Sequence, residues 1–159
     1  CVHSGDAEQE LMLKRGVYIA HSPESNMNLA SGVAPVNQFI DRGLHVGLAT
    51  DVAGGSHESM LKAMMHAIQA SKLRWRLLDQ NVKPLSFERA FYLATMGGGQ
   101  FFGKVGSFLD GYELDAVVLD DASLEHPQTL SSRARLERMV YLADERNIAA
   151  KFVSGRKVL

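Results

Sequence analysis

The chain has 159 residues and a mass of 17.4 kDa, and 46% of its residues are hydrophobic. This is the length of one ordinary domain, with enough apolar residues to bury a core. The 17 Lys and Arg residues nearly balance the 18 Asp and Glu residues, so the formal net charge is -1. Charge therefore gives no reason to expect nucleic acid or an anionic membrane as a partner.

The apolar runs are too short for a membrane span, which needs about 20 residues. The longest are pieces such as Val117 to Leu119. No signal-peptide pattern is present, so the sequence predicts a cytoplasmic protein. The single cysteine, Cys1, excludes an internal disulfide and a cysteine-based structural zinc site. Any metal would therefore depend on histidine and carboxylate ligands.

Helical and strand patterns alternate along the first half of the chain. They predict a helix over 6–15, a strand over 17–20, a helix over 34–43 and a strand over 45–50. Residues 22–32 form a polar connection that is long for such a link. It is interpreted as a loop, either shaping a pocket or simply solvated.

The second half begins with an amphipathic helix from about Ser56 to Leu73, followed by a helix from Ser86 to Ala94. The three glycines at 97–99 are interpreted as helix packing or termination. Later come a strand over 114–119, a helix over 134–142 and a strand or strand pair over 152–159. Two parallel strands are too few for a barrel or a stable parallel sheet. The sequence therefore predicts an α/β chain that is part of something larger, with a separate small sheet in its tail.

Asp51 is the strongest candidate for a functional residue. It follows a buried strand, where α/β proteins place catalytic groups, and it precedes Gly54 and Gly55. Adjacent glycines favour a functional role because they let the backbone approach a ligand closely. The alternative is that Asp51 caps the helix predicted to begin near Ser56.

The six histidines show no spacing that would place two of them on one metal. His21 ends the first strand on the same side as Asp51 and could face the same cavity, or could simply bond to a loop. His66 is interpreted as a surface or partly buried helix residue, His126 as a loop residue, and His45 as lying at the end opposite the chemistry.

Four stretches carry a more specific pattern, and they lie in this order: HSPESN from His21, GLATDVAGG from Gly47, LATMGG from Leu93 and YLADERNI from Tyr141. Together they resemble the C-terminal part of the guanine deaminase family, within the amidohydrolase superfamily. The Thr50-Asp51 pair is shared across that superfamily. The continuation from Val52 to Gly55 and the stretch from Tyr141 are specific to guanine deaminases.

The resemblance implies that the chain is the C-terminal portion of a (βα)8 TIM-type barrel, with barrel strands seven and eight over residues 1–105. Residues 106–159 would supply strands of a small β-sandwich with a connecting helix. Asp51 would be the carboxylate metal ligand and would accept a proton from the attacking water. The metal would be zinc, or else iron. The remaining ligands, all histidines, and a proton-shuttling glutamate lie in family segments that this chain does not contain.

The expected function is guanine deamination by metal-activated hydroxide, with a small purine as substrate and a homodimer as the full-length assembly. Another aminoheterocycle deaminase or a chlorohydrolase of the same superfamily remains an alternative, as does a noncatalytic remnant of such an enzyme. With one ligand, the chain alone is expected to be inactive.

Overall fold

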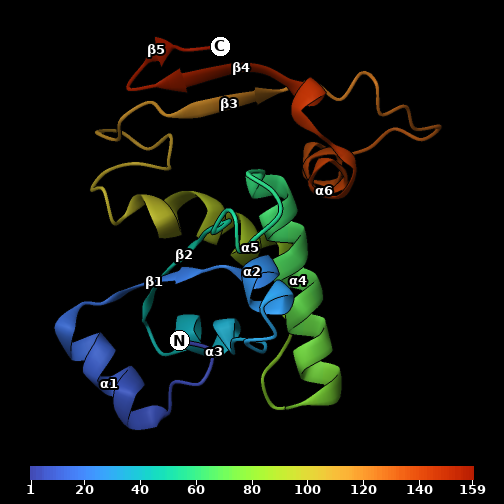
Figure 1. The fold of residues 1–159 in the computed structure, drawn as a ribbon. Coiled ribbons are helices and arrows are strands. Elements are labelled where there is room, and N and C mark those ends of the chain that lie inside the picture. Colours follow the sequence, from blue (N-terminus) through green and yellow to red (C-terminus); the bar gives the residue numbers. More distant parts are fainter.

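The computed structural model describes all residues, 1–159, and its centre is a pair of short parallel strands (Figure 1). Strand β1 (Tyr18–His21) pairs with β2 (His45–Leu48), with Tyr18 opposite His45 and His21 opposite Leu48. Helix α1 (Asp6–Arg15) comes before β1 and ends at Gly16, whose φ of 62° suits a glycine cap. Helices α2 (Pro23–Asn28) and α3 (Val36–Asp41) lie in the connection between the strands.

Only one face of the two-stranded sheet is buried. Ile19 and His21 on β1 and Val46 and Leu48 on β2 are buried, whereas Tyr18 and Ala20 between them are exposed. Successive side chains of a strand point to opposite faces, so the buried set faces the helices. The core joins the apolar residues of the two strands to Leu85, which lies just before α5, and to side chains of the later helices, including Met64, Ala67, Ile68, Phe87, Ala90 and Leu93.

The helices that cover this face follow β2 in the chain. The longest is α4 (Met60–Leu77), whose cap residue Ser59 accepts a hydrogen bond from the Lys62 amide. Helix α5 (Phe87–Tyr92) continues into the π-helical segment η1 (Leu93–Gly97), which packs on β2. A Cβ built on Gly47 would lie 2.7 Å from the Gly98 Cα, and one on Gly97 would lie 2.6 Å from the Val46 carbonyl oxygen. The three-glycine run thus serves helix packing, one of the two interpretations of its sequence.

A second, antiparallel sheet lies apart from the first, at the top of Figure 1. Its order is β3 (Ala116–Leu119), β4 (Ile148–Val153) and β5 (Arg156–Lys157), and Ser154 and Gly155 form the tight turn between the last two. Helix α6 (Ser132–Leu142) and the short 3-10 helix η2 (Glu145–Asn147) precede β4. Because α6 packs on α4 and its Val140 joins the main core, this region is attached to the first through α6.

Two of the predicted elements are wrong in an informative way. The connection over 22–32 contains helix α2, and the helix predicted from about Ser56 begins at Met60 and continues to Leu77. Pro23 in the first turn of α2 favours a helix start, because its fixed φ suits that position. The helix predicted over 6–15 has the predicted ends, and the other predicted elements are present with shifted ends, the largest shift being β4, which begins at Ile148. None of the helices combines the length and apolar character that crossing a membrane requires.

Candidate active site

Asp51 lies just beyond the carboxyl end of β2 and is exposed. Its φ is 51°, in the left-handed region, and its carbonyl oxygen accepts a hydrogen bond from the Gly55 amide at 2.7 Å. Asp51 caps no helix, since α4 begins nine residues later with Ser59 as its cap. The helix-cap interpretation of Asp51 is therefore wrong, and its place after a parallel strand is confirmed.

The Asp51 carboxylate is held by helix α2. The Ser25 hydroxyl donates a hydrogen bond to Asp51 Oδ2 at 2.6 Å, and Ser25 is only 2% exposed. The other oxygen, Oδ1, takes part in no hydrogen bond or ion pair within the chain. The segment over 22–32 and Asp51 are thus brought together, by a direct contact from a helix. A cavity shared by the two stays a prediction.

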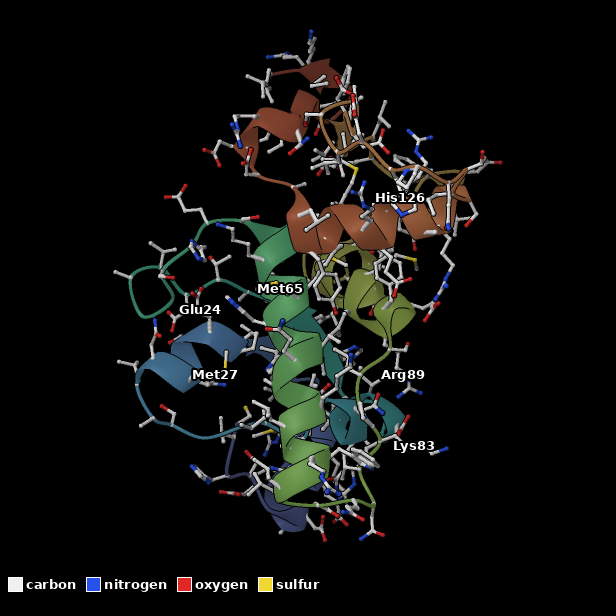
Figure 2. All side chains as sticks on the ribbon, turned by 90° about the vertical axis from the view of Figure 1, so that its right-hand side faces the viewer. Glu24, Met27, Met65, Lys83, Arg89 and His126 are labelled. Carbon is white, nitrogen blue, oxygen red and sulfur yellow. The ribbon has the colours of Figure 1, made fainter.

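Two further side chains of α2 bind the loop that carries Asp51. Asn28 Nδ2 donates to the Gly54 carbonyl oxygen at 3.0 Å, and the Ser56 hydroxyl donates to Glu24 Oε1. Figure 2 shows Glu24 on α2 beside this loop, with Met27 further along the same helix. Helix α2 therefore contacts the loop at three points: the Asp51 carboxylate, the backbone at Gly54, and Ser56.

Glu24 is also close to two histidines. Its carboxylate oxygens lie 3.8 Å from His57 Nε2 and 3.8 Å from His66 Nδ1. Burial alone would raise the pKa of Glu24, but the Ser56 hydrogen bond and the two histidines outweigh it, and the pKa lies below its ordinary value. Glu24 is consequently an anion at neutral pH, adjacent to the Asp51 loop.

The paired glycines serve contacts within the chain. A Cβ on Gly54 would lie 2.5 Å from Ser25 Oγ and 3.1 Å from Asp51 Oδ2, and one on Gly55 would lie 2.1 Å from the Thr50 carbonyl oxygen. The close approach that these glycines permit is between α2, Asp51 and the turn itself. They therefore supply no separate sign of a bound ligand.

His21 does not join Asp51. It is 5% exposed, on the same face of β1 as Ile19, and its Nε2 atom is buried without a hydrogen-bond partner. Burial lowers its pKa to about 4, because the charged ring is poorly solvated there. His21 is thus a neutral residue buried under the helices at neutral pH.

The remaining histidines lie apart from Asp51 or make structural contacts. His3 bonds to the Ser31 carbonyl oxygen at 2.9 Å, His45 stacks on Tyr18 with ring centroids 4.6 Å apart, and His126 bonds within its own loop. In Figure 2, His126 lies beside α6, well away from Glu24. No three His, Cys, Asp or Glu side chains come together in a way that could hold a metal ion.

Ser25, Asn28 and Glu24 were not identified from the sequence as contacts of Asp51 and its loop, although two of them lie in the HSPESN stretch. The available signal was Pro23 followed by polar residues three and four positions apart, a spacing that places Glu24 and Asn28 on one side of a short helix. Recognising that helix would have directed attention to whatever its polar side faces.

Comparisons with known proteins agree over the whole chain. The model of the amidohydrolase family matches residues 1–158. A probable guanine deaminase of Schizosaccharomyces pombe is 37% identical over 99% of the chain. The structure of a C. acetobutylicum guanine deaminase with guanine in its active site superposes with a TM-score of 0.94 at 42% identity, over 100% of the chain. The structure of a zinc-bound adenosine deaminase of Xanthomonas campestris superposes with a TM-score of 0.81 at 25% sequence identity, over 98% of the chain.

The match covers only part of each relative. The chain spans 31% of the S. pombe protein, 38% of the C. acetobutylicum chain and 35% of the X. campestris chain. It therefore corresponds to about a third of the length of the proteins it resembles.

Proposed function

The chain belongs to the amidohydrolase family, and we propose that it is the C-terminal part of a guanine deaminase, which converts guanine and water to xanthine and ammonia. The observation that carries this proposal is the close likeness of the entire chain to the guanine-bound bacterial enzyme. Asp51 adds support from the site, as an exposed carboxylate after a parallel strand.

The residues present fit a metal site at one coordination position. Asp51 is exposed and its Oδ1 forms no hydrogen bond within the chain, which suits a carboxylate ligand to zinc or iron. The resemblance assigns the other ligands to histidines in segments outside this chain. When bound, such a metal supplies a water of lowered pKa and hence a nucleophile at neutral pH.

Asp51 would also move the proton of that water. The water oxygen would bond to the ring carbon that bears the amino group, and the Asp51 carboxylate would accept the proton that the water loses. The same carboxyl would then donate this proton to the departing amino group, so that the carbon–nitrogen bond would break and neutral ammonia would leave. The hydroxyl on that carbon would become the carbonyl of xanthine as its proton passes to the glutamate outside this chain. Protonation of the ring nitrogen would fall to the family's glutamate, outside this chain.

The chain's place in the complete enzyme is part of the proposal. Strands β1 and β2 would be barrel strands seven and eight, with the barrel part over 1–105 and the β-sandwich strands over 106–159. The two-stranded parallel sheet with its uncovered face and the separate antiparallel sheet support this placement. The proposal includes a homodimeric assembly, from the resemblance, and a cytoplasmic location, from the composition.

Substrate assays on the full-length protein test the function. Guanine, adenosine and an aminotriazine are compared under the same conditions, and kcat/KM for guanine should exceed the others. Adenosine is the sharpest alternative because a zinc-bound adenosine deaminase is a structural neighbour. Faster turnover of adenosine or the triazine would assign a different deaminase. The 159-residue chain, assayed alone, should show no turnover because it provides one metal ligand.

A further inference from the structure

We propose that Ser25 is a positioning residue for the active-site carboxylate: its hydroxyl fixes Asp51 so that Oδ2 is occupied and Oδ1 would be left to bind the metal. The inference rests on the proposed function insofar as Asp51 is a metal ligand. It assigns a role to a helix, α2, whose polar side chains have no part in the chemistry derived above.

The two partners differ in freedom. Ser25 is buried and lies within α2, where its carbonyl oxygen accepts a hydrogen bond from the Leu29 amide, and α2 packs on α4. Asp51, in contrast, is exposed and lies in a loop. A bond of 2.6 Å from a buried hydroxyl to a carboxylate that has no other partner therefore sets the orientation of the carboxylate.

This bond does not hold the loop by itself. Asn28 holds the backbone at Gly54, and Glu24 accepts from Ser56, both independently of the Asp51 side chain. Loss of the Ser25 hydroxyl should consequently leave the loop in place and free only the carboxylate. Outer partners of metal ligands typically change metal affinity or activity by about 10- to 100-fold.

Gly54 provides a second route to the same contact. An added methyl group at Gly54 would meet Ser25 Oγ at 2.5 Å and Asp51 Oδ2 at 3.1 Å. Because Gly54 has no positive φ, alanine fits its backbone. Gly54→Ala should therefore separate the two side chains without altering either.

The test is a zinc titration of the metal-free, full-length protein against a chromogenic chelator. S25A should weaken zinc binding about 10-fold or more, whereas the matched variant N28A should change it by less than about threefold. G54A should follow S25A. At saturating zinc, kcat for guanine should fall in S25A with KM unchanged, because Ser25 is proposed to act only through Asp51.

The proposal is overturned if S25A weakens zinc binding less than about three times as strongly as N28A does. If S25A does not fold, the same criterion is applied to G54A. If the wild-type protein binds zinc but turns over another amine faster than guanine, guanine deamination is overturned. The comparison of S25A with N28A then still tests the role of Ser25. Wild-type protein that binds neither zinc nor iron overturns both.

Discussion

Asp51 in the first region and two aspartates of the second region are held in opposite ways. At the carboxyl ends of β1 and β2, Asp51 has a single neutral donor, Ser25, 26 residues away in the chain. Around α6 and the second sheet, Arg135 binds both oxygens of Asp121, and Arg146 binds both oxygens of Asp144. The arginine lowers the pKa of Asp121 in one pair and that of Asp144, to about 2, in the other.

The difference shows which carboxylate is available for chemistry. An arginine that binds both oxygens neutralises the carboxylate and leaves little capacity for a metal or a proton. Asp51 forms no ion pair and keeps Oδ1 free. Proximity to a strand end does not distinguish the two regions, because Asp121 also follows a strand, β3.

The largest effect should come from Asp51→Asn in the full-length enzyme. The amide keeps the shape but loses the charge and the proton acceptor, so guanine turnover should fall at least about 100-fold and metal content should drop. Asp121→Asn is the control from the other region and should leave both values near those of wild type. Steady-state assays and elemental analysis measure the two. Near-normal turnover and metal content in the Asp51 variant would contradict the assignment.

His21 should produce a smaller effect, on stability. Its pKa is about 4 in the folded chain, below the ordinary 6.5, so the unfolded chain binds more protons between these values. The free energy of unfolding should therefore decrease as pH falls from 6.5 toward 4, by up to about 3 kcal/mol. Above pH 6.5 this contribution is fully present.

Urea unfolding at pH 7 and pH 4.5 measures the His21 effect. His21→Gln should lose less stability over this interval than wild type, while His126→Gln, at an exposed position of the other region, should follow wild type. Parallel pH profiles for His21→Gln and wild type would show that His21 is not the titrating group.

The arrangement of strands and helices was predictable because short apolar runs and helical spacing alternate along the chain. The position of Asp51 was predictable for a similarly local reason. Helix α2 was not, since PESNMN has no apolar period and few strong helix formers. Its contacts with Asp51, Gly54 and Ser56 are with residues that lie 26 to 32 positions further along the chain.

A site residue was predictable only where its position in the sequence was enough to indicate its role. Asp51 follows an apolar run, whereas the role of Ser25 depends on where α2 places its hydroxyl. Gly54 and Gly55 show the same limit of sequence-based prediction. The sequence indicates that other atoms can approach these glycines closely, and only the structure shows that the atoms belong to Ser25 and Thr50.

Close packing in the first region should be tested with a pair of glycine variants. Gly47→Ala places a methyl group against the Gly98 backbone, which cannot move aside easily, and should reduce the free energy of unfolding by about 2 kcal/mol. Gly98→Ala meets only ordinary contacts, at 3.5 Å or more, and should be neutral or slightly stabilising in its helical position. Equal losses in urea unfolding would contradict the packing argument.

The smallest effect should come from the second region's ion pairs. Arg135 and Asp121 meet near the surface, where solvent screening and the ordering of a long side chain offset most of the attraction. Arg135→Ala should therefore leave the urea midpoint at pH 7 unchanged within error.

Arg138, three residues along α6, instead donates to the carbonyl oxygens of Leu124 and Glu125 and is the matched comparison. Arg138→Ala should lower the midpoint measurably, because two backbone acceptors lose their donor and the loop before α6 is released. If Arg135→Ala lowers the urea midpoint as much as Arg138→Ala does, the Arg135–Asp121 pair contributes to the stability of the fold. The pair would then not be a surface contact of negligible energy.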